Sequence, residues 1–123
     1  MKAIVAALIF SIIPLSAFAG WSDFDRTDKI LFSSVVVSQI ADGLTTAATI
    51  KNGNGIHETF AWKYGASHPS PGRLWTVKAA ELCLAYVVAG RLSGPYRKAF
   101  LGCTAALLIY CAANNGLSFS ITY

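Results

Sequence analysis

The 123-residue chain is short enough to form a single domain, and its composition favours a lipid bilayer over water as its solvent. Hydrophobic residues make up 54% of the sequence and charged residues 13%, and the charges lie between long uncharged runs. The net charge of +4 does not indicate nucleic-acid binding, because Lys and Arg stand singly or in pairs at the ends of apolar segments. Such positions are typical of membrane-flanking anchors, so we expect the bilayer, and no nucleic acid, as a partner.

Residues 1–19 have the layout of a secretory signal peptide. Lys2 is followed by an apolar core from Ala3 and by the small-x-small triplet Ala17-Phe18-Ala19, which predicts cleavage after Ala19. The alternative is an uncleaved first transmembrane helix, since the segment from Ala3 to Ala19 is just long enough to span a bilayer. In either case this N-terminal segment would direct the chain to a membrane.

Residues 20–123 are expected to form one multi-pass membrane domain, an all-α integral membrane bundle of three transmembrane helices, or four if the N-terminal segment is retained. The first helix is expected at about residues 27–51, with Asp42 as the only charge between Ile30 and Ile50. Asp25 or Thr27 can cap its start, because either side chain accepts a hydrogen bond from a free first-turn N–H group.

The second and third helices are expected at about residues 73–91 and 98–121, joined by a hairpin linker with Gly94-Pro95 as the turn. An aromatic cluster in the preceding connection, Phe60, Trp62 and Tyr64, suits a loop at the level of the lipid headgroups or a short interfacial helix. The orientation stays open. A signal peptide would place Gly20 outside, whereas the distribution of Lys and Arg favours the opposite.

Three cysteines, Cys83, Cys103 and Cys111, lie in apolar segments and show no C-x-x-C spacing. We expect buried, inert thiols and no disulfide framework. The chain also lacks the H-E-x-x-H pattern of zinc enzymes, so neither a metal nor another cofactor is expected.

A polar stripe follows one face of the first predicted helix. At about 100° per residue, its members fall within about 60° of the direction of Asp42, while apolar side chains point the other way. The stripe should therefore face protein or water, and the opposite face lipid. Its members are Ser38, Gln39, Asp42, Thr45, Thr46 and Thr49.

Asp42 lies about 18 Å from the start of this apolar segment, close to the middle of a hydrocarbon core of about 30 Å. An ionised Asp at that depth costs on the order of 3 kcal/mol, so it must be paired, hydrated or protonated. The first candidate partner is Lys78, one turn into the next helix, with Glu81 on a neighbouring face. Arg73 and His57 are the other basic candidates.

The segment QIADGLTTAATIKNGNGIHE, from Gln39 to Glu58, resembles a signature of small multi-pass bacterial membrane proteins of unknown function. Those proteins continue from the Glu into Asn-Pro, whereas Thr59-Phe60 follows Glu58 here. The resemblance implies a multi-pass fold and no particular activity. The matching positions are Asp42, Thr45, Thr46, Gly53, Gly55, Glu58 and Lys78.

The leading hypothesis is a small multi-pass protein of the bacterial inner membrane with an accessory or interaction role, its partner being a second copy or another membrane protein. A pore, a phage-type holin or a small transporter is the first alternative, with the stripe lining water in an oligomer. An enzyme is less favoured; it would use His57, Glu58, His68 and Asp42 as ligands or acid–base groups. A secreted soluble domain with an apolar core is the last.

Overall fold

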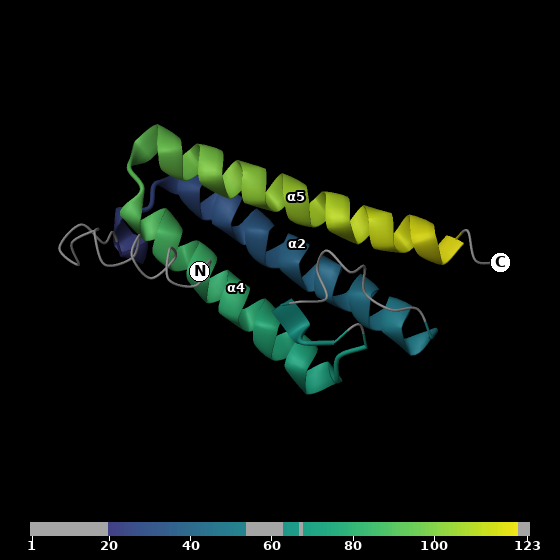
Figure 1. Ribbon diagram of the computed structural model, residues 1–123. Coiled ribbons are helices and arrows are strands. Elements are labelled where there is room, and N and C mark those ends of the chain that lie inside the picture. The colour runs from purple at the N-terminus through teal and green to yellow at the C-terminus, as the bar shows by residue number, and fades with distance from the viewer. Residues whose placement is uncertain (1–19, 54–62, 67, 121–123) are drawn as a thin grey trace.

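The computed structural model describes residues 20–53, 63–66 and 68–120. They form a short 3₁₀-helix, η2 (Trp21–Asp23), and three long helices, α2 (Arg26–Lys51), α4 (Pro71–Arg91) and α5 (Gly94–Ser120) (Figure 1). These residues contain no strand, which confirms the all-helical class. The predicted cleavage site and the rings of Phe60 and Trp62 lie outside the described residues.

Helix α2 begins at a capping box. The backbone N–H of Asp28 donates to the carboxylate of Asp25 at 2.8 Å, and the N–H of Asp25 donates back to Asp28 at 3.1 Å. Of the two predicted caps, Asp25 is therefore the one used, and two first-turn donors gain acceptors. At the other end, Gly53 adopts a positive φ of 84°, a conformation that favours glycine and ends the helix.

The connection between α4 and α5 is shorter than predicted. Helix α5 begins at Gly94 and not near residue 98, so that only Leu92 and Ser93 join the two helices. Pro95 falls in the first turn of α5, where proline is favoured because the N–H group that it lacks would have no intrahelical acceptor. The pair Gly94-Pro95 thus starts a helix instead of forming the turn.

Helix α2 contacts both other helices, and Figure 1 shows it between α4 and α5. It runs parallel to α5, because Asp25 pairs with Lys98 and Asp42 with Asn115, both at a separation of 73 residues. It runs antiparallel to α4. One turn further along α2, from Gln39 to Asp42, the partner on α4 moves back from Glu81 to Lys78.

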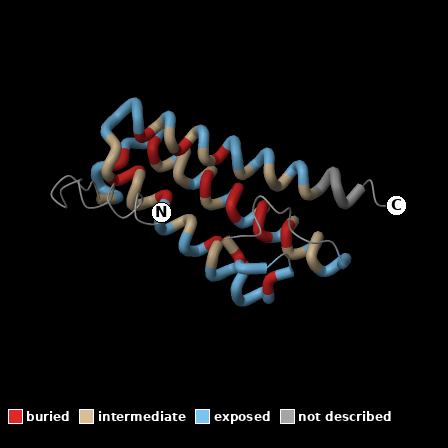
Figure 2. Tube along the Cα trace, viewed as in Figure 1, coloured by how far each residue is buried: buried red, intermediate tan, exposed pale blue. Residues whose placement is uncertain are grey.

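The apolar core lies where the three helices meet near the start of α2. Alanines contribute much of it, and their short side chains let the helix backbones approach closely. Four aromatic rings extend the core toward η2, and the centroids of two of them, Phe32 and Tyr86, are 5.5 Å apart. The four are Trp21, Phe24, Phe32 and Tyr86. Figure 2 shows the buried positions concentrated on the facing sides of the helices. The buried cluster consists of Phe24, Val35, Ala85, Ala89, Leu101 and Ala105.

One expectation about burial is wrong. Cys83 and Cys103 are exposed and Cys111 is half-buried. In a three-helix arrangement, each of α4 and α5 is covered by its neighbours on one side only. Tyr64, a member of the aromatic cluster before α4, is only 3% exposed, and its backbone carbonyl accepts a hydrogen bond from Arg73 at 3.2 Å. The segment before α4 is therefore folded onto the helices at Tyr64.

One helix among the described residues, α2, is long and apolar enough to cross a membrane by its length and composition. A single helix of this kind near the N-terminus is weak evidence that the chain crosses a membrane, since a buried helix of a soluble protein has the same properties.

Candidate functional site

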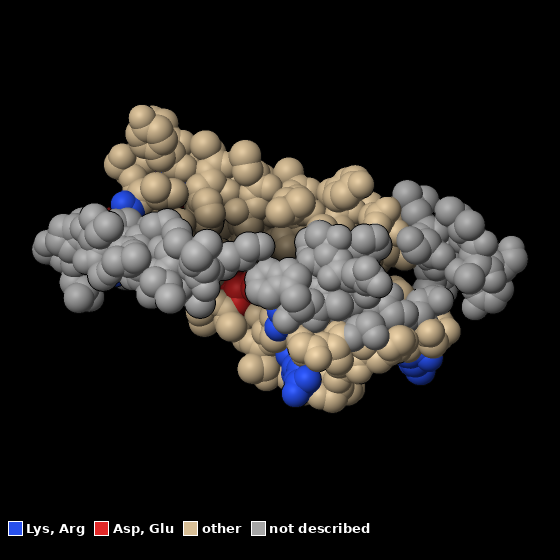
Figure 3. Space-filling view, in the orientation of Figure 1, with Lys and Arg blue, Asp and Glu red and all other residues tan. Residues whose placement is uncertain are grey.

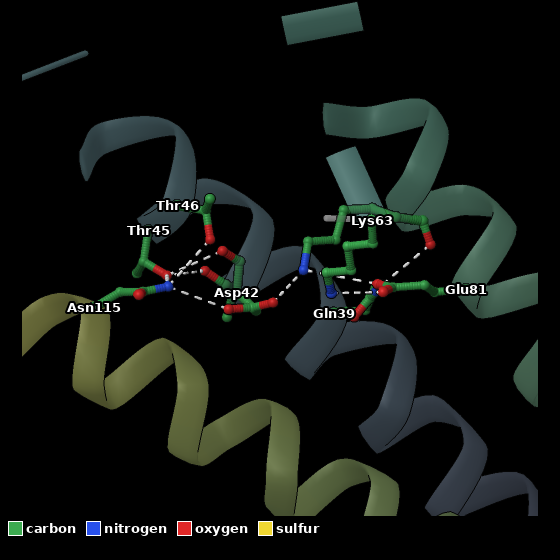
Figure 4. A network of polar contacts seen from close by, with 9 residues as sticks. Gln39, Asp42, Thr45, Thr46, Lys63, Glu81 and Asn115 are labelled. Carbon is green, nitrogen blue, oxygen red and sulfur yellow. Dashed lines mark hydrogen bonds and ion pairs between the residues drawn. The ribbon is translucent and has the colours of Figure 1, made fainter. Parts of the chain in front are cut away.

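Asp42 lies at the centre of a network of polar side chains between the three helices (Figure 4). Asp42 is 6% exposed, and its Oδ2 forms an ion pair with Lys78 Nζ, which α4 contributes. Its Oδ1 accepts a hydrogen bond of 3.2 Å from the Asn115 amide on α5. Lys78 is 3% exposed, so this is a buried ion pair. Both oxygens of Asp42 are satisfied from within the chain.

A second carboxylate, Glu81, lies one turn along α4 and joins the same network. Gln39 donates from Nε2 to Glu81 Oε2 at 2.7 Å and to the backbone carbonyl of Lys78 at 3.1 Å. Lys78 Nζ is 3.8 Å from Glu81 Oε2, so it stands between two carboxylates. The antiparallel pairing of α2 and α4 produces this arrangement, because i and i+3 positions on each helix lie on one face.

Lys63, which precedes α4, completes the charge balance. Its Nζ lies 2.6 Å from Glu81 Oε1, and the two side chains are 23% and 32% exposed. Sequence reasoning treated Lys63 only as a membrane-flanking anchor. Two carboxylates thus meet two ammonium groups, and burial of a neutral set costs less than burial of an isolated charge.

Asn115 is, besides Lys63, the other member of the network that sequence reasoning missed. Besides Asp42, its amide donates to the hydroxyl oxygens of Thr45 at 3.2 Å and Thr46 at 3.1 Å. The Thr45 hydroxyl in turn donates to the carbonyl of Ala41 at 2.9 Å. The available signal was an amide within an uncharged helical run, the same kind of exception that singled out Asp42. We call the eight residues Gln39, Asp42, Thr45, Thr46, Lys63, Lys78, Glu81 and Asn115 the polar network.

Other residues of the predicted stripe stay outside the polar network. The hydroxyls of Ser38 and Thr49 donate to carbonyls of their own helix, at 2.6 and 2.9 Å. His68 is exposed, and His57 and Glu58 lie outside the described residues. Among the described residues, no group of three or more His, Cys, Asp or Glu side chains is placed to hold a metal ion.

A second set of charges ties the start of α2 to the start of α5. Asp28 is 2% exposed and receives Arg97 Nη1 at 3.1 Å and Lys98 Nζ at 3.0 Å. Lys98 also reaches Asp25 at 2.6 Å. We call Asp25, Asp28, Arg97 and Lys98 the end cluster. The hydrogen bond from Lys98 is the main cause that lowers the pKa of the Asp25 carboxyl below its ordinary value.

Arg97, one of the basic residues interpreted from the sequence as membrane-flanking anchors, is buried between the helices. Its side chain is 8% exposed, its Nε donates to the carbonyl of Ala89 at 2.9 Å, and its guanidinium lies 4.6 Å from the ring centroid of Phe24. The short connection after α4 causes this, because it brings the first turn of α5 directly over the capping box of α2.

Searches against protein-family models, curated proteins and solved structures find no match for this chain. The geometry of the two clusters therefore has to carry the functional argument. Most donors and acceptors in the polar network bond one another, which suits a structure that fixes three helices in one register.

Proposed function

We propose that this chain is a small multi-pass protein of the bacterial inner membrane, whose helices cross the bilayer and whose role is to bind other membrane proteins as an accessory subunit. One observation carries the proposal. The polar face of α2 is neutralised inside the chain, while large apolar side chains point outward. An inward polar and outward apolar distribution suits a hydrocarbon solvent.

The outward faces of all three helices support this placement. Val37 is 66% exposed on α2, Leu84 50% on α4 and Leu107 59% on α5. Exposure of apolar area to water forfeits about 25 cal/mol per Å², whereas lipid tails impose no such loss. On the face turned to the viewer in Figure 3, the described surface is mainly uncharged.

The lengths and charges of the helices are also compatible with three crossings. Helix α4 has 21 residues and α5 has 27, enough for a core of about 30 Å at about 1.5 Å per residue. Arg73 and Arg91 stand near the two ends of α4, where long side chains can reach the interface. The interior charges of α4, Lys78 and Glu81, have counter-ions in Asp42 and Lys63.

A binding role fits the outer apolar faces better than the polar network. Because Asp42 and Glu81 are already paired within the chain, a partner helix need not supply them with counter-ions. Contacts with a second copy or with another membrane protein would then use exposed residues of α5 such as Leu107 and Tyr110.

The first test is membrane extraction followed by crosslinking. The chain should stay with membranes after a carbonate wash, and release into the soluble fraction would contradict the membrane placement. A photocrosslinking residue at Tyr110, 68% exposed, should capture a protein, whereas the same residue at Leu101, 0% exposed, should not. Capture of lipid alone from position 110 and from the neighbouring exposed position 107 would overturn the accessory role.

A liposome assay separates this role from a pore. Purified protein should leave a trapped dye in place, and Asp42→Asn should not change that result. Leakage that Asp42→Asn alters would replace the accessory role with a water-lined oligomer in which Asp42 faces the channel.

A further inference from the structure

We propose that a groove between α2 and α5 binds an anionic phospholipid, with one acyl chain along the groove and the phosphate held by Arg26 and Lys29. The inference rests on the proposed membrane location. The groove has a volume of about 1040 Å³. Its α2 wall is Arg26, Lys29, Ile30, Ser33, Ser34, Val37, Ser38 and Ala41, and its α5 wall is Ile109, Ala112 and Ala113.

Both basic side chains lie at one end of the groove. Within the part of the chain that the structure describes, neither Arg26 nor Lys29 forms an ion pair, and Lys29 Nζ lies 5.7 Å from the ring centroid of Trp21. The nearest acids in sequence, Asp25 and Asp28, are engaged by the end cluster. Two positive charges therefore remain for an anion at this end.

The rest of the groove presents little free polarity. The hydroxyls of Ser33, Ser34 and Ser38 donate to carbonyls of their own helix at 2.8, 3.0 and 2.6 Å. Short alanine side chains on both walls leave the space, and Val37 and Ile109 border it. A hydrocarbon chain needs such a surface, since it gives dispersion contacts without stranding a donor.

The dimensions match one leaflet. From Ile30 to Ala41 the α2 wall rises about 16 Å at about 1.5 Å per residue, which is close to half of a hydrocarbon core of about 30 Å. Arg26 lies about one turn before this stretch and Lys29 directly before it, and both long side chains can reach headgroup level. A phosphate at these two side chains would place its acyl chain along the apolar wall.

Charge complementarity favours a lipid over a second helix as the occupant. A second copy of the chain would bring the same two cations to the groove, and like charges repel. An anionic phospholipid supplies both the phosphate and the hydrocarbon that the groove lacks.

The test is native mass spectrometry of the full chain in neutral detergent with added phosphatidylglycerol or phosphatidylcholine. Phosphatidylglycerol should bind more tightly. Because each cation near anionic lipid contributes about a fivefold change in affinity, Lys29→Gln and Arg26→Gln should each weaken binding about fivefold, and the pair about twenty-five-fold. Lys51→Gln, which removes the same charge at the opposite end of α2, should leave the affinity unchanged.

A second variant tests the hydrocarbon half of the site. Ala113→Phe fills the groove and should weaken the binding of both lipids about tenfold. Ala80→Phe, on the exposed face of α4, should leave the binding of both unchanged. Equal losses from Lys29→Gln and Lys51→Gln, or binding unaffected by Ala113→Phe, would overturn the proposal. So would a dimer that Ala113→Phe dissociates, or inorganic phosphate that competes as well as the lipid.

These outcomes are separable from failure of the proposed function. If the wild-type chain resists carbonate extraction but shows no lipid preference, the phospholipid site is wrong and the membrane placement stands. Extraction of the wild-type chain by carbonate would contradict both the phospholipid site and the membrane placement.

Discussion

The end cluster and the polar network both join helices through buried ion pairs, but they distribute their charges differently. In the end cluster Asp28 has two cations, Arg97 and Lys98, so that loss of one leaves the other. In the polar network, among the described residues, Asp42 has a single cation, Lys78, with the Asn115 amide as its other partner. Redundancy of partners, more than burial alone, should decide how much a substitution at each site destabilises the fold.

The largest effect should follow from separating Asp42 and Lys78. Either Asp42→Ala or Lys78→Ala leaves a buried charge without its partner, which destabilises by about 3–5 kcal/mol. Lys78→Ala should be the more severe, because Asp42 loses its one cation, whereas Lys78 without Asp42 keeps Glu81 at 3.8 Å. Thermal unfolding in detergent measures both.

The double variant decides whether the pair is energetically coupled. Asp42→Ala combined with Lys78→Ala should recover part of the loss, since no orphan charge remains in the interior. Strictly additive losses would show that the two residues act independently.

A smaller effect is expected at the end cluster. Arg97→Ala removes hydrogen bonds to Asp28 and to the carbonyl of Ala89, and loss of a bond to a charged group costs about 1.5–3 kcal/mol. Lys98 remains at 3.0 Å from Asp28 and should limit the damage. A thermal shift for Arg97→Ala as large as that for Lys78→Ala would refute the importance of redundancy.

Packing beside the polar network gives a third, smaller effect. A Cβ added at Gly43 would lie 2.6 Å from the Trp75 ring, so Gly43→Ala forces the ring or α4 to move and should cost about 1–3 kcal/mol. At Gly102 nothing lies within 4 Å of the added atom, and Gly102→Ala should be neutral or stabilising. The unfolding temperature should therefore fall for Gly43→Ala and stay unchanged or rise for Gly102→Ala, and Trp75→Ala should relieve the loss caused by Gly43→Ala.

The smallest effect is expected on the stability of the fold at low pH, through the Asp25 carboxyl. Because Lys98 lowers the folded-state pKa of Asp25, this carboxyl stabilises the fold above its unfolded pKa of about 3.9 and loses that contribution as the pH falls through the lower folded value. Asparagine also caps helices well, so Asp25→Asn should keep α2 intact and flatten this part of the acid unfolding curve. A curve identical to that of the wild type would show that the pairing with Lys98 adds nothing.

The sequence was most informative where one residue contradicts its surroundings. Asp42 stands alone in an apolar run, and this predicted both a polar face on α2 and Lys78 as the nearest counter-ion. The cap at Asp25 could be predicted for a similar local reason, since it depends only on neighbouring backbone groups.

What the sequence did not reveal depends on the pairing of α2 with α5. Asn115 and Arg97 contact α2 across separations of 69 to 73 residues, and no local pattern fixes which faces of two parallel helices meet. The cysteines were misjudged for a related reason. An apolar helix has more than one apolar face, and a three-helix arrangement covers only part of each.

The equal spacing of the contacts between α2 and α5 fixes the register of the two helices along their length. The same number of residues separates Asp25 from Asp42 as separates Lys98 from Asn115, so both pairs lie at one offset of 73. Deletion of a single residue between Lys98 and Asn115 would rotate the amide by about 100° and withdraw it by about 1.5 Å. The segment between these two points should therefore tolerate many changes of side chain and almost no change of length.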